Sequence, residues 1–121
     1  MNHEPDVEAY LTGIEPVDII RLLNDTVGPF VADGATDDGL RVFTGGTSKL
    51  VITPNIQDGF VSVWLRGEPR WRSDVDFARF LAVALQCRAR CDPGADYPQV
   101  DPRSDVFVDI KDGSETLIVW R

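Results

Sequence analysis

The chain has 121 residues, enough for one domain, and 43% of them are hydrophobic, more than a disordered protein carries. Twenty acidic residues outweigh twelve basic ones and give a formal net charge of −8. This charge argues against nucleic acid and anionic membrane surfaces as partners, because both bind through an excess of Lys and Arg. The sequence shows no signal-peptide pattern and no apolar run of membrane-spanning length, so we expect a single cytoplasmic domain over residues 1–121.

The N-terminal part of the chain is expected to contain one helix. Residues 1–12 are predicted to be a loose arm or a short helical turn. A helix then begins near Pro16, because proline suits the first turn of a helix, and it ends at Gly28-Pro29. Apolar residues recur at helical spacing between these limits: Val17, Ile19, Ile20, Leu22, Leu23 and Val27.

Three short strands are predicted next, over residues 40–44, 49–53 and 60–66, and the last is rich in β-branched and aromatic residues. A turn-rich loop over residues 33–39 precedes them. Its three Asp residues could approach a hard cation, but they lack the ligand spacing of a calcium loop. We therefore predict no metal site there.

A second helix has the clearest boundaries. Ser73 is a favourable N-cap residue, and Asp92-Pro93-Gly94 ends the segment. Arg88 and Arg90 suit the negative end of the helix dipole. One face of this helix should be buried, through Phe77, Phe80, Leu81, Ala84 and Leu85.

The side chains that usually carry catalysis are sparse. His3 is the only histidine, which argues against a Ser–His or Cys–His system. Cys87 and Cys91, four residues apart on the predicted helix, do not complete a zinc site and should be a buried pair. We therefore expect no catalytic residue, no cofactor and no metal. A small enzyme or a ligand-binding protein is the third-ranked alternative.

The cluster Arg66, Arg70, Trp71 and Arg72 could stack on nucleic acid and pair with its phosphates. In a chain this acidic, ion pairs with the protein's own carboxylates are the favoured interpretation.

A final hairpin is predicted from Asp112-Gly113, a strong signal for a two-residue type I′ turn between strands over residues 105–111 and 115–120. The element order is then α-β-β-β-α-β-β. This order predicts an α+β fold, with an antiparallel sheet of about five strands and two helices on one face.

The turn also fixes which side chains share a face. Val106, Val108 and Ile110 should lie opposite Val119, Leu117 and Glu115 and face the helices. The other face should pair Phe107 with Ile118, Asp109 with Thr116, and Asp105 with Trp120.

The second face is the predicted binding surface. Phe107, Ile118 and Trp120 form an apolar patch there, with Trp120 as the anchor, because Trp is favoured at binding hot spots. Asp105 and Asp109 would give the patch a negative rim that suits a basic partner. The alternative is that the N-terminal arm, the proline-rich loop or a second layer covers these residues.

In size, acidity and α+β layout the chain resembles the small immunity proteins that bacteria make beside their own secreted toxins. Its preference for Arg over Lys is also common in GC-rich bacterial genomes. The resemblance implies a cytoplasmic toxin inhibitor that binds a cognate toxin through an acidic, aromatic surface. Trp64 and Trp71 are secondary candidates for that surface.

The element order is also similar to that of type III secretion chaperones, which are small, acidic and cytosolic. This resemblance implies a homodimer that binds an extended effector segment. Those chaperones continue into a last helix that this sequence does not predict.

Overall fold

The computed structural model describes residues 6–35 and 39–121 and confirms an α+β fold. Within these residues the sheet has eight antiparallel strands, more than the five or so predicted. The elements in chain order are β1 (Asp6–Thr12), α1 (Pro16–Val27), β2 (Val31–Ala35), β3 (Arg41–Gly45), β4 (Ser48–Gln57), β5 (Phe60–Arg66), α2 (Asp74–Leu85), β6 (Arg88–Cys91), the 3-10 turn η1 (Gly94–Asp96), β7 (Val106–Lys111) and β8 (Ser114–Val119).

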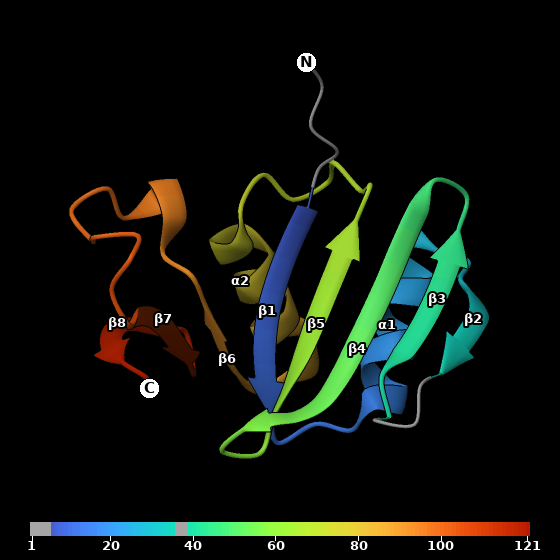
Figure 1. The fold of residues 1–121 in the computed structure, drawn as a ribbon, viewed down its shortest axis with the longest axis horizontal. Helices are drawn as coiled ribbons and strands as arrows, with labels where there is room; N and C mark the ends of the chain where they lie inside the picture. The colour runs from blue at the N-terminus through green and yellow to red at the C-terminus, as the bar shows by residue number, and fades with distance from the viewer. Residues whose placement is uncertain (1–5, 36–38) are drawn as a thin grey trace.

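The strands follow one another across the sheet in the order β2-β3-β4-β5-β1-β6-β7-β8. Figure 1 shows α1 and α2 together behind the sheet, as predicted, with β1 in the middle of the strands. The main core therefore lies between the helices and one face of the sheet, and we call the other face the open face.

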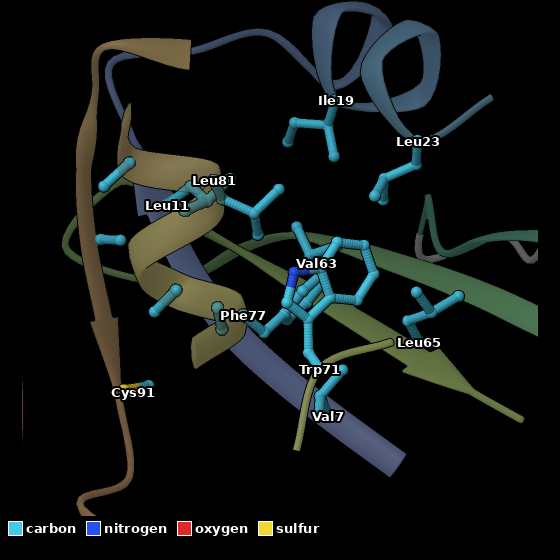
Figure 2. Close-up of a cluster of buried hydrophobic side chains, with 14 of the residues drawn as sticks. Val7, Leu11, Ile19, Leu23, Val63, Leu65, Trp71, Phe77, Leu81 and Cys91 are labelled. Atoms are coloured by element: carbon cyan, nitrogen blue, oxygen red, sulfur yellow. The ribbon is translucent and has the colours of Figure 1, made fainter. Parts of the chain in front are cut away.

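The core follows the alternation of the strands and the spacing of the helices. Val7, Ala9 and Leu11 on β1 are fully buried, as are Val63 and Leu65 on β5. Figure 2 shows these strands beneath the two helices, with Ile19 and Leu23 from α1 and Phe77 and Leu81 from α2 directed into the same space.

The position of β1 differs most from the prediction. Residues 6–12 form neither a loose arm nor a helical turn; they pair with β5 on one side and with β6 on the other. The physical reason is a period of two in the sequence Val7-Glu8-Ala9-Tyr10-Leu11, in which every second residue is apolar and buried. Residues 1–5, including His3, lie outside the described residues.

The second helix ends earlier than predicted. Gln86 adopts a left-handed conformation with φ of 51°, which ends α2 at Leu85. The residues Arg88 to Cys91 then form β6 instead of a last helical turn. Cys87 and Cys91 therefore do not share a helix face: Cys91 is buried in the core and Cys87 is half-buried.

Other boundaries agree with the sequence. Pro16 stands at the start of α1, and the Ser73 hydroxyl accepts a hydrogen bond from the Asp76 backbone N–H at 3.1 Å. In the final hairpin, Asp112 and Gly113 both have positive φ values, 52° and 80°, as a type I′ turn requires. The predicted register is confirmed at every pair that lies within β7 and β8, and the Trp120 backbone N–H donates to the Asp105 carbonyl oxygen, in agreement with the remaining pair.

The loop predicted over residues 33–39 is partly a strand. Residues 31–35 form β2 at one edge of the sheet, with a register shift between Ala32 and Gly34. Residues 36–38 lie outside the described residues.

Candidate functional site

The open face carries every second side chain of the sheet. Across its middle, Tyr10 of β1 lies between Ser62 of β5 and Arg90 of β6, and Arg90 in turn lies opposite Asp109 of β7. Within the described residues no helix packs on the open face. The side chains on this face are therefore covered by other parts of the sheet.

The sheet provides that covering by curling. The register between β4 and β5 shifts between Thr53 and Gln57, an irregularity that bends the tip of this hairpin. The tip reaches Trp120, although three strands separate β5 from β8 in the sheet. The Trp120 indole N–H donates to the Asp58 carboxylate at 2.8 Å, and the Phe60 and Trp120 ring centroids are 4.8 Å apart. The open face is therefore concave, and in Figure 1 β7 and β8 are turned sharply away from β1 and β5.

Four rings fill the bottom of this concavity, and we call them the aromatic nest: Tyr10, Phe60, Phe107 and Trp120. The Tyr10 centroid lies 5.5 Å from that of Trp120 and 6.1 Å from that of Phe107. Phe107 and Trp120 are 5.2 Å apart. Three of these contacts are edge-to-face, the favourable geometry for aromatic pairs.

An ion pair stands inside the aromatic nest. The Arg90 guanidinium lies 4.6 Å from the centre of the Phe60 ring and 4.9 Å from that of Trp120. Its Nε also donates to the Asp109 carboxylate at 2.8 Å, with Arg88 Nε 3.4 Å from the same oxygen. The aromatic rings and the carboxylate thus fix the orientation of Arg90.

The predicted site residues meet at this place, but their exposure is uneven. Phe107 and Ile118 are half-buried on the open face, and the Asp105 side chain is 60% exposed beside Arg121. Trp120 and Asp109 are only 9% and 8% exposed. Trp120 is therefore not an exposed anchor, because the β4–β5 tip covers it. Asp109 is not part of a negative rim, because two arginines neutralise it.

The exposed apolar groups of β8 lie on its other side. Leu117 and Val119 were expected to face the core, yet they are 42% and 61% exposed. The reason is the reach of α2, which packs on β1, β6 and β7. β8 extends beyond it.

The far end of the open face is polar and carries charges of both signs, since Arg66 lies opposite Asp6 and Lys49 lies opposite Arg66. The Glu8 carboxylate accepts hydrogen bonds from the Ser62 hydroxyl at 2.8 Å and from the Tyr10 hydroxyl at 3.2 Å. The Trp64 indole N–H donates to Asp6 at 2.6 Å. Burial and the neighbouring Glu8 carboxylate raise the pKa of Tyr10, so this hydroxyl stays protonated at neutral pH.

Burial perturbs two titratable groups on the helix side, and hydrogen bonding perturbs a third. Burial raises the pKa of Asp74 to about 6, and the charges of Asp92 and Glu8 add to this effect. Burial also raises the pKa of Cys87 to about 11, which disfavours its reactive thiolate form. The Arg79 guanidinium and the Tyr97 hydroxyl both bond to Glu115, and the bond to Arg79 holds the Glu115 pKa below its usual value.

The basic-aromatic cluster is split between core and surface. Trp71 is buried against Phe77 and Phe80, at centroid distances of 4.9 and 5.0 Å, and Arg70 lies 5.8 Å from its ring. Arg72 pairs with Asp76 at 3.8 Å. Of these contacts only the Arg72 pair is an ion pair of the expected kind, and the burial of Trp71 makes it a core residue.

The sequence interpretation missed three members of the site: Tyr10, Phe60 and Arg90. Tyr10 and Arg90 lie on strands that were not predicted. The alternation of polar and apolar residues in Val7–Leu11 and in Arg88–Cys91 is the signal that could have identified both strands.

Comparison of the chain with protein-family models, with curated proteins and with solved structures found no significant match in any of the three. Neither helix of the described residues is long and apolar enough to span a membrane.

Proposed function

We propose that this chain is a non-catalytic protein-binding domain, and in class an immunity protein that binds and neutralises a cognate bacterial toxin. The observation that supports this proposal is the concave open face with half-buried apolar side chains. Trp and Tyr are among the residue types that contribute most to binding energy in protein interfaces. The candidate contact residues are Tyr10, Val51, Trp64, Phe107 and Ile118.

The overall charge favours a basic partner, whereas the charges on this face are mixed. Asp105 is exposed near one end beside Arg121, and Asp6 and Glu8 lie at the other end beside Arg66 and Lys49. The net charge of −8 attracts a basic partner over a longer range. A toxin whose basic surface packs on this face would meet half-buried apolar side chains at its centre and could pair with Asp6 and Asp105 at its rim.

The test is binding to the product of the neighbouring gene, which for an immunity protein encodes the toxin. The two purified proteins should form a tight complex in isothermal titration calorimetry. Asp105→Lys reverses an exposed charge on the open face and should weaken the complex about tenfold. Asp25→Lys makes the same charge change on the exposed side of α1 and should leave the affinity within about twofold.

Absence of a complex with the wild-type protein would count against the immunity role. Equal weakening by the two variants would instead assign the effect to net charge and remove the open face as the site.

A further inference from the structure

The last strand of the sheet, β8, has an unprotected edge. It pairs with β7 on one side and is the outermost strand of the described residues. Natural edge strands are commonly protected against pairing with another chain by Lys, Pro or a bulge. The run from Thr116 to Trp120 contains no charge and no proline, and its pairing with β7 has no register shift. It consists entirely of residues that suit a strand interior.

One backbone hydrogen bond shows which residues of β8 direct their N–H and C=O groups away from β7. The Trp120 backbone N–H donates to the Asp105 carbonyl oxygen at 2.9 Å, so at Trp120 the backbone is directed toward β7. This direction alternates along an antiparallel strand. Glu115, Leu117 and Val119 therefore direct their N–H and C=O groups away from β7, and a further strand would bond to these three residues.

We propose that the occupant of this edge is β8 of a second copy of the chain, antiparallel about a two-fold axis at Ile118. In this register Leu117 lies opposite Val119 of the second copy, and the required hydrogen-bond directions are kept. Continuing by one pair brings Arg121, whose side chain is exposed beside Asp105, opposite Glu115, which already bonds to Arg79 and Tyr97, so an arginine of the second copy joins this carboxylate twice in the dimer. A register centred on Leu117 would instead place Glu115 opposite Val119, without a charged residue of the second copy.

The side chains beside the edge support a second copy as the occupant. Leu117 and Val119 are exposed, and with Val100 and Val106 they line a groove of about 480 Å³. The two-fold axis would join this groove to an identical one, so that both sets of apolar side chains lose contact with water. The pairing uses the strand edge and does not rest on the function proposed for the open face.

The first test is the oligomeric state of the full chain by sedimentation velocity over a concentration series. The wild type should form a dimer. Val119→Lys adds the charge that protects natural edges and should raise the dimer Kd at least about tenfold. Val31→Lys is the matched control, because Val31 is a similarly exposed valine, at 68%, on the opposite edge strand β2. A wild-type monomer at all concentrations overturns the proposal and leaves the edge to a strand of a different protein.

The second test examines the register. Ile118→Cys should form a disulfide between copies under mild oxidation, because residues on the axis have Cα atoms about 4.5 Å apart. Thr116→Cys should not form such a disulfide, because the residue opposite it in the second copy is Trp120. Arg121→Glu places a second carboxylate opposite Glu115 and should weaken the dimer several-fold, a result that does not depend on the folding of Val119→Lys. Equal cross-linking of both Cys variants, or an unchanged dimer in Arg121→Glu, contradicts this register.

Discussion

The two faces of the sheet are filled by different chemistry. The helix side is an apolar core in which side chains such as Leu65 and Phe77 are fully buried. The only two buried polar residues of the described chain, Ser62 and Asp109, both lie on the open face. There the aromatic nest encloses an ion pair instead of excluding charge.

This difference separates two tasks. The apolar core holds α1 and α2 on the sheet, so it determines whether the chain folds. The aromatic nest joins β5 to β8 across three intervening strands, so it determines how strongly the sheet curls. Variants of the core should therefore lower global stability, whereas variants of the nest should also change the shape of the open face.

The largest effect is expected in the core. Phe77→Ala removes a ring that is fully buried between α2 and Trp71, and it should lower the free energy of unfolding by about 4 kcal/mol. Urea denaturation monitored by circular dichroism measures this change. Val83→Ala, at a 72% exposed position on the same helix, is the control and should change stability by less than about 0.5 kcal/mol.

A smaller loss is expected for the aromatic nest. Trp120→Ala should lower the free energy of unfolding by about 3 kcal/mol, because the ring is buried. The loss is smaller than for Phe77→Ala because Trp120 lies near one end of the sheet. Trp120→Phe keeps most of the apolar area but loses the hydrogen bond to Asp58, so it should lower the free energy of unfolding by about 1 kcal/mol. Faster amide exchange around Asp58 and Gly59 in both variants would show that the β4–β5 tip has been released. Unchanged exchange would mean that Trp120 does not hold the curl.

The ion pair should contribute less again. Asp109→Asn leaves Arg90 and Arg88 without their carboxylate and should cost about 2 kcal/mol in urea denaturation. Asp105→Asn, an exposed carboxylate beside Arg121, should cost less than about 0.5 kcal/mol. Similar losses in the two variants would contradict a special role for the pair inside the nest.

The smallest effect is a pH dependence on the helix side. Burial raises the pKa of Asp74 to about 6 from 3.8, so ionisation is less favourable in the folded state. The stabilisation from its protonated form is complete below pH 3.8 and is lost as the pH rises through 6.

Asp74→Asn can still accept the Glu8 backbone N–H, which lies 2.9 Å from Asp74 Oδ1, but it carries no charge. It should therefore be more stable than the wild type by about 1 kcal/mol at pH 7 and equally stable near pH 3.5. Urea denaturation at the two pH values measures this difference. Asp25→Asn, at an exposed position on α1, is the control for the loss of one negative charge from the chain.

The sequence predicts those elements whose determinants are local. Pro16 and the Ser73 cap mark the starts of the two helices, and the Asp112-Gly113 turn predicts which residues of β7 and β8 lie opposite each other. It does not predict β1 or β6 as readily, because each is a short strand stabilised by partners far along the chain. The end of α2 at Gln86 also lacks a Gly or Pro signal.

The candidate site is predictable only where it depends on local sequence. Turn geometry assigns Phe107, Ile118 and Trp120 to one face of the hairpin. The burial of Trp120 depends on the bend near Thr53, and the exposure of Leu117 depends on how far α2 extends. Both are properties of the assembled sheet and have no local pattern.

The central place of β1 has a consequence for how the protein is made. β1 is synthesised before both of its neighbours, and it cannot be enclosed until Arg88–Arg90 have left the ribosome. At typical translation rates this delay is on the order of ten seconds, and such distant pairing also slows folding. Glu8 interrupts the apolar residues of β1 while this strand is still unpaired, and a charge at such a position limits aggregation of the nascent chain.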